Sequence, residues 1–265
     1  MNYLVAGVTD SVWYSHDSWR SHMPLDPQVM PIEDVRPIRG QLSLDREGNF
    51  LADAPCAVKD FLDREAAARV YLPELEEVVR QVTGAHKVVV GRGWGAPAQR
   101  PLPAVHGGRR HLPRPLRPRR LQRQLRPHGC AHDARRRPAA DELLKGRFAV
   151  LNLWRALSDP PQDTPLCVCD ATTVAAEDLA ISRVVLGPDP EKAMRLETNM
   201  VQHNPEHRWV YYSRHEPGRA PDLPRLRLRS RAVPRVPHTA FDDPSAGRDA
   251  PPRESIDIRC VAFFD

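Results

Sequence analysis

Two short motifs near the C-terminus carry side chains that suit binding of a metal ion and of a carboxylate. The stretch PHTAF (237–241) presents His238, a potential imidazole ligand, and Arg253 and Ser255 follow as Arg-x-Ser. An arginine meets a carboxylate through two parallel charge-assisted hydrogen bonds, and a serine hydroxyl adds a third donor. Together these side chains could hold a metal ion beside a small acid.

A second potential metal ligand is His106 in the stretch AVHGGRRHLPR (104–114). Residues i and i+2 of a strand point to the same side, so an acid two positions after a histidine can share its metal. Position 108 is glycine, which offers no ligand. His106 could therefore bind a metal ion, but no acid stands two positions after it.

Both C-terminal assignments have a competitor. His207, which precedes the aromatic run of residues 209–212, competes with His238 as the second imidazole, and the alternative role for His207 is a loop-end histidine bonded to a backbone carbonyl. Arg259 competes with Arg253 for the acid because it lies on the same strand-like run.

Residues Asn152 and Trp154 are candidates for contact with a substrate. Strand alternation in LNLWRAL (151–157) points both to one side and Arg155 to the other. A tryptophan in such a run belongs to a core more often than to a substrate platform, so that alternative stays open for Trp154.

Other kinds of site lack their motifs. No G-x-G-x-x-G follows a strand-like run, and the glycine-rich GRGWG (91–95) lacks the P-loop lysine. Neither a G-x-S-x-G elbow nor H-E-x-x-H occurs. Dinucleotide-binding, P-loop, α/β-hydrolase and zincin sites are therefore not indicated.

The elements that must position these residues are mostly short strands. Runs rich in β-branched and aromatic residues predict strands at 86–90, 148–157, 165–170, 181–187, 207–213 and 255–264. Apolar residues at helical spacing in 60–83, with Pro73 between them, predict two helices or one kinked helix that stops at Gly84. Residues 40–58 predict a hairpin that turns at 47–49. We expect a mainly β (α+β) protein in which residues 1–84 form an arm with helices packed on a β domain of residues 85–265.

Positive charge is concentrated in one part of the chain. The formal charge of the protein is +5, but residues 91–140 hold 13 Arg, no Lys and one acid, a local charge of +12 that leaves −7 elsewhere. This block and residues 214–236 alternate Arg and Pro with Leu, which predicts irregular loops at 107–138 and 214–236. A basic nucleic-acid-binding module is the alternative, although aromatic interleaving is absent; its mark would be affinity that falls steeply with salt.

A third interpretation explains both blocks. Translation of a GC-rich coding sequence in the wrong frame gives a segment that lacks lysine and is rich in Arg, Pro and Leu. Back-translation of residues 214–228 yields an amphipathic turn followed by a strand in the neighbouring frame, and residues 108–118 yield an Asp shortly after His106. We hypothesise paired, compensating frameshifts, which the nucleotide sequence tests directly.

The segments outside these blocks resemble a known family. The ordered set N-x-W-R, P-L-x-x-C-D-A, H-R-W, P-H-T-A-F and P-R-E-S-I, spread over about residues 85–265, is similar to the hydroxylase/desaturase proteins typified by AsaB, CmcJ, NvfI and the fungal gibberellin desaturase. Each motif alone is weak evidence for the family, but the five motifs in this order are specific to it. The resemblance implies a double-stranded β-helix, or jelly roll.

The resemblance also implies an oxidoreductase that hydroxylates or desaturates a small organic molecule of secondary metabolism, with Fe(II) and 2-oxoglutarate as cofactors. Iron would then be held by His106 and His238, and 2-oxoglutarate by Arg253 and Ser255. A catalytically damaged homologue that lacks the metal-binding acid is the alternative. With neither an export signal nor an 18-residue apolar span, we expect a cytoplasmic protein with a small-molecule substrate and no membrane partner.

Overall fold

The structure, a computed structural model, describes the greater part of the chain. The described residues are 1–54, 56–91, 143, 146–158, 161–187, 189, 193–213, 222–223, 228–229, 236–247, 250 and 252–265. His106 and the predicted loop 107–138 lie outside them, as does most of 214–236.

The longest strands form a sheet near the C-terminus of the chain. Its order is β13 (Leu228–Arg229), β7 (Arg147–Ala156), β15 (Ser255–Phe264) and β6 (Lys87–Val90), and every neighbouring pair is antiparallel. Strands β7 and β15 pair along their whole length, from Ser255 opposite Ala156 to Phe264 opposite Arg147. This long ladder fixes which side chains share a face.

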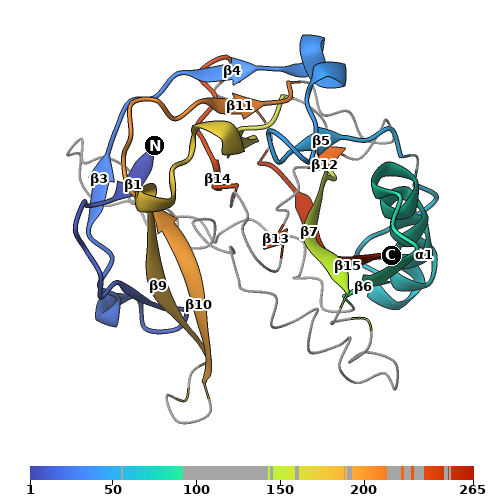
Figure 1. The fold of residues 1–265 in the computed structure, drawn as a ribbon, viewed down its shortest axis with the longest axis horizontal. Helices are drawn as coiled ribbons and strands as arrows, with labels where there is room; N and C mark the ends of the chain where they lie inside the picture. Colours follow the sequence, from blue (N-terminus) through green and yellow to red (C-terminus); the bar gives the residue numbers. More distant parts are fainter. Residues whose placement is uncertain are drawn as a thin grey trace.

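One face of this sheet is covered by the helix α1 (Arg64–Thr83), as Figure 1 shows. Tyr71, Leu75 and Val79, spaced four residues apart, are buried in a core that also holds alternate residues of β7 and β15. Pro73 lies inside this single helix, so of the two predicted alternatives the structure has one helix and not two. Gly84 ends it as predicted, with a φ of 68° and its N–H bonded to the carbonyl of Arg80 at 2.9 Å. Among the described residues no helix is long and apolar enough to cross a bilayer.

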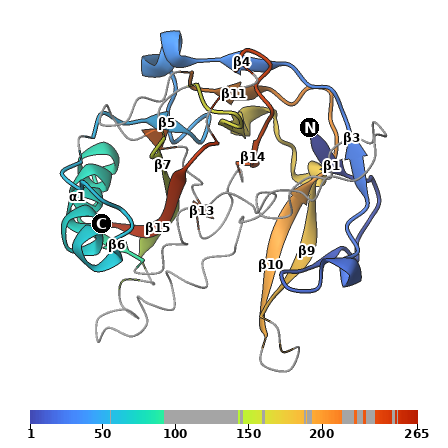
Figure 2. The same cartoon turned by 180° about the vertical axis from the view of Figure 1, so that it is seen from behind.

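A second sheet carries His238, and smaller sheets complete the fold (Figure 1; Figure 2, from behind). The second sheet is β14 (His238–Ala240), β8 (Leu166–Cys169), β11 (Trp209–Tyr211) and β4 (Ile32–Asp34). The others are β10 (Met194–Val201), β9 (Leu179–Leu186) and β2 (Val12–Tyr14); β1 (Asn2–Leu4) and β3 (Leu25–Pro27); and β12 (Asp222–Leu223) and β5 (Phe50–Leu51). Four 3-10 helices span Ser18–Arg20, Arg36–Gln41, Ala171–Thr173 and Ala176–Asp178.

The six predicted strands are all present, and three other features differ from the sequence predictions. Residues 40–58 turn at Gly48 but form no hairpin, because β5 pairs with β12 instead. Within 214–236, predicted to be irregular, residues 222–223 and 228–229 each form a short strand. The N-terminal arm does more than pack on the core, since β2 and β4 join sheets as parallel neighbours of β9 and β11.

Candidate functional site

One face of the β7–β15 sheet packs under α1 and is apolar. The opposite face is polar around Asn152 and Arg259, and this part is called the polar face; its other end is apolar around Val150, Val261 and Phe263. Leu151 and Leu153 pack in the core under α1, so the alternate residues Asn152 and Trp154 point to the opposite face. Both are nearly buried, with 6% and 7% of their surface exposed. The pairing register places Arg259 beside Asn152, and its Nε donates to Asn152 Oδ1 at 3.2 Å. Sequence reasoning expected Asn152 and Trp154 on one side, and the structure brings Arg259 there too.

The motif Arg-x-Ser lies at the start of the same strand. Arg253 is 6% exposed, its guanidinium carbon lies 5.2 Å from the ring centroid of Trp154, and its backbone N–H donates to Asp163 Oδ1 at 2.9 Å. Ser255 begins β15 opposite Ala156 and is half-buried. The stacking on an arginine gives Trp154 a contact beyond core filling.

His238 begins β14 opposite Val168 and is half-buried. Its Nδ1 lies 3.3 Å from the carbonyl oxygen of Val236. Burial lowers the pKa of this imidazole, while the charge of Asp257 and the Val236 carbonyl oppose that effect and the charge of Arg259 adds to it. The lowered pKa favours the neutral imidazole, the form in which a histidine binds metal, and the charges of Asp257 and Arg259 on β15 act on this ring.

Asp257 is a residue of this face that sequence reasoning missed. It lies between Ser255 and Arg259 at the two-residue spacing of a strand, and the register sets it opposite Trp154. Its Oδ1 is buried and has no hydrogen-bond partner in the described part of the chain. The period-two pattern Ser-x-Asp-x-Arg was the signal that could have found it.

His207 lies in a different core, away from the polar face. Its side chain is fully buried, with Nε2 3.1 Å from Asp178 Oδ2 and Nδ1 3.4 Å from the hydroxyl of Tyr3. Tyr3 stacks on the ring and accepts a hydrogen bond from Trp209 Nε1 at 2.7 Å. Both ring nitrogens are engaged by side chains, where the sequence suggested a backbone carbonyl, and burial lowers the pKa of His207.

A complete metal centre is not present among the described residues. They contain no group of three or more His, Cys, Asp or Glu side chains placed to hold a metal. His106 lies outside them, so its predicted convergence with His238 stays a prediction. The structure brings together His238, Asn152, Trp154, Arg253 and Arg259, and it separates His207 from them.

Comparison with known proteins finds relatives along nearly the whole chain. The Fe(II)/2-oxoglutarate-dependent dioxygenase nvfI of Aspergillus novofumigatus (strain IBT 16806) is 30% identical over 89% of this chain and 84% of its own length. The hydroxylase/desaturase efuI of Hormonema carpetanum is 28% identical over 92% and 86%. A solved structure, titled iron and alpha-ketoglutarate-dependent endoperoxidase NvfI, superposes with a TM-score of 0.70 at 22% identity, over 100% of this chain and 96% of that chain.

The fold and site define a mainly β protein of the jelly-roll type, as the resemblance implied. The chain belongs to the family described as the oxidoreductase/YMDC permease-like domain, which matches residues 2–92 and 123–263. It also belongs with the hydroxylase/desaturase relatives predicted from its motifs. The family match leaves out residues 93–122, the stretch that contains His106.

Proposed function

We propose that this protein is an oxidoreductase that hydroxylates or desaturates a small organic molecule of secondary metabolism, with Fe(II) and 2-oxoglutarate as cofactors. The observation that carries the proposal is the convergence of His238, from one sheet, with the polar face of β7 and β15. An imidazole beside guanidinium groups suits a metal that shares its coordination sphere with a 2-oxo acid. The names of the relatives supply the same two cofactors.

The donor set of the described residues fits the 2-oxo acid. Arg253 and Arg259 supply two guanidinium groups, Ser255 a hydroxyl, and Asp257 one opposing charge, so this face keeps a net positive charge for a dicarboxylate. In the proposed site Arg253 and Ser255 bind the far carboxylate, with Arg259 as the competing anchor. The charge of Arg259 acts on His238, so Arg259 remains the alternative to Arg253 as the residue that binds the far carboxylate.

The donor set fits iron in part. His238 supplies one imidazole, and the proposed second ligand is His106. The third, a carboxylate two residues after His106, is absent because position 108 is glycine. When bound, Fe(II) and 2-oxoglutarate would supply a two-electron oxidation that uses O₂ and converts the 2-oxo acid to succinate and CO₂. The residues Asn152 and Trp154 would border the substrate and exclude water from it.

A damaged homologue is the second candidate, and two observations favour it. Gly108 cannot bind metal, and the family match stops at 92 and resumes at 123. A chain that keeps the jelly roll but lost one ligand would fold and bind the 2-oxo acid without turnover. The compensating-frameshift hypothesis also predicts no turnover by the chain as written. It predicts turnover by a chain whose two blocks are translated in the neighbouring frame.

The test compares the chain as written with a version whose two Arg-rich blocks, residues 107–138 and 214–236, are restored to the neighbouring frame, which leaves His106 and His238 unchanged. Anaerobic protein is loaded with Fe(II) and 2-oxoglutarate, exposed to O₂, and assayed for succinate, which forms even without the true substrate. We expect succinate from the restored chain and little or none from the chain as written. Absence of succinate from both would reject the proposed chemistry.

Matched variants of the restored chain assign the residues. His238→Gln should abolish succinate formation, whereas His207→Gln, in the separate core, should change stability and leave the rate per folded molecule intact. Arg253→Lys should raise the KM for 2-oxoglutarate about 10- to 150-fold, the loss expected for one charged hydrogen bond. A larger effect from Arg259→Lys would exchange the roles of the two arginines.

A further inference from the structure

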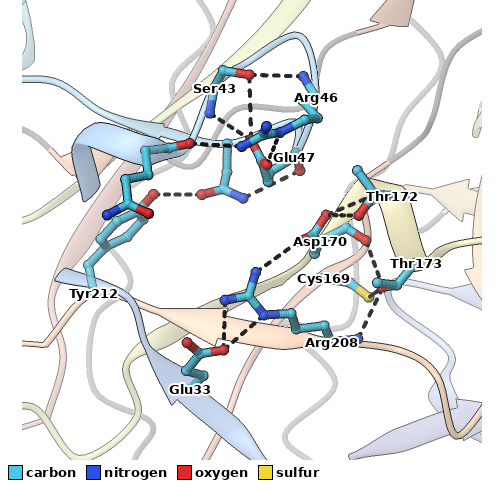
Figure 3. Close-up of polar contacts among 12 residues, drawn as sticks. Glu33, Ser43, Arg46, Glu47, Cys169, Asp170, Thr172, Thr173, Arg208 and Tyr212 are labelled. Atoms are coloured by element: carbon cyan, nitrogen blue, oxygen red, sulfur yellow. Dashed lines mark hydrogen bonds and ion pairs between the residues drawn. The ribbon is translucent and has the colours of Figure 1, made fainter. Parts of the chain in front are cut away.

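A compact turn in the N-terminal arm, residues 43–49, is held in shape by its own hydrogen bonds (Figure 3). The carboxylate of Glu47 accepts the backbone N–H of Ser43 at 2.8 Å and pairs with the Nε of Arg46. The N–H of Gly48 donates to the carbonyl of Ser43 at 3.1 Å. These hydrogen bonds hold the turn in one conformation.

This turn docks on the sheet that carries His238. The carbonyl of Glu47 accepts the N–H of Ala171, just beyond β8, at 3.0 Å. The hydroxyl of Tyr212, just beyond β11, donates to Asn49 Oδ1 at 2.6 Å. In the order β14-β8-β11-β4, the turn is therefore bonded just beyond β8, the neighbour of β14, and just beyond the next strand, β11.

Gly48 is the point where the turn meets the His238 segment. A Cβ added at Gly48 would overlap Cγ2 of Val236 and lie 3.2 Å from Cβ of Ala171. The φ of Gly48 is +79°, a conformation that residues with a side chain rarely adopt. Both the backbone angle and the available space require glycine here.

The position of Val236 constrains the position of His238, which follows two residues later. Pro237 joins the two and stiffens the segment, because its ring fixes φ and also restricts the residue before it. The carbonyl of Pro237 accepts the N–H of Cys169 on β8 at 2.8 Å, and the carbonyl of Val236 lies 3.3 Å from His238 Nδ1. When Nδ1 carries the proton and donates it to Val236, the lone pair of the neutral ring is on Nε2.

We infer that Gly48 is a positioning residue for His238: by letting the 43–49 turn pack directly on Val236, it places the carbonyl that orients the imidazole and leaves Nε2 to a metal ion. The orienting role is that of an outer-shell carbonyl, which fixes the tautomer and ring plane of a metal-binding histidine. Only the last step, metal on Nε2, rests on the proposed function.

The experiment uses Gly48→Ala, the double variant Gly48→Ala with Val236→Ala, and the control Gly7→Ala. Gly7 has a φ of +78° with nothing within 4 Å of an added Cβ, so its variant has the same backbone cost without the overlap. The double variant removes the methyl that the new Cβ would meet, which keeps the test usable even where Gly48→Ala alone unfolds.

Two readouts separate positioning from folding. The first is the tautomer of His238 in ¹⁵N-histidine-labelled protein, read from the ring nitrogen shifts and assigned with His238→Gln. The second is the affinity for Co(II), an oxygen-stable substitute for Fe(II), by calorimetry. We expect Gly48→Ala to lose the Nδ1–H tautomer and to bind Co(II) about 10- to 100-fold more weakly. Gly7→Ala should match the wild type, and the double variant should recover towards it.

The inference is wrong if Gly48→Ala keeps the wild-type tautomer, if Gly7→Ala loses it as well, or if the double variant of a folded Gly48→Ala shows no recovery. Where the tautomer responds as expected but no variant binds Co(II) through His238, the positioning role stands and the proposed metal function falls. The two ideas therefore fail separately.

Discussion

The hydroxyl of Tyr212 should contribute measurably to stability, because it joins the 43–49 turn to the second sheet. Tyr212 is 3% exposed and Asn49 is 0% exposed, and their 2.6 Å hydrogen bond satisfies a carbonyl oxygen that water cannot reach. Tyr212→Phe keeps the ring and removes only the donor, so the buried Asn49 Oδ1 loses its partner. Leaving such a group unsatisfied costs about 1–3 kcal/mol.

For a chain of this length that cost corresponds to a fall in Tm of about 2 to 12 °C. The measurement is urea unfolding followed by tryptophan fluorescence, together with a thermal scan. Tyr211→Phe is the matched control, because Tyr211 is the neighbouring residue on β11 and is half-buried. A loss for Tyr212→Phe no larger than that for Tyr211→Phe would refute the role of the turn as a docked unit.

Three further predictions concern other buried polar groups. The pKa of His207 is lowered in the folded protein, so the unfolded chain binds this proton first as pH falls. Its contribution to stability should therefore fall below about pH 6.5, by at most about 1.4 kcal/mol per pH unit. In urea unfolding over that window, His207→Gln should have a smaller pH slope than the wild type, and the slope that remains includes His238. Arg155→Met should cost about 2–6 kcal/mol in the same assay, because Arg155 donates to Tyr71 Oη and to the carbonyl of Ala54, both at 3.0 Å, and each buried oxygen left without its donor costs about 1–3 kcal/mol; a loss below 1 kcal/mol would contradict this. Asp170→Ala should lower Tm by several degrees, since Asp170 caps the 3-10 helix after β8 and pairs with Arg208 (Figure 3), and Asp170→Asn should recover part of the loss.

Strands with a strong local pattern were predictable from the sequence. The runs 148–157 and 255–264 combine β-branched and aromatic residues with flanking turns, and they became β7 and β15. Strand β10 escaped prediction because its sequence, MRLETNMV, has a single β-branched apolar residue and places Arg195 and Glu197 on its exposed side. It forms a strand because it pairs with β9, and a local sequence pattern cannot show that pairing.

The site was predictable in residue types and not in geometry. His238 and Arg253 were found from motifs, since imidazole and guanidinium chemistry is visible in the sequence. The role of Asp257 depends on which face of β15 turns away from α1, and that is set by the pairing with β7. Gly48 depends on a contact with Val236 across 188 positions of the chain, which a single sequence does not reveal.

The places in the chain where predicted site residues are present, and the one place where an acid is absent, bear on how position 108 came to be glycine. Asn152, Trp154, His238, Arg253 and Arg259 all lie in segments of ordinary composition, and each keeps a specific contact in the structure. Gradual decay of an unused enzyme would remove such contacts as readily as a ligand at position 108. Position 108, where the acid is missing, instead falls in the lysine-free block, within residues 93–122, which the family match omits. The hypothesis of a local change of reading frame predicts this coincidence, and the nucleotide sequence across residues 107–138 tests it against independent substitutions in the site.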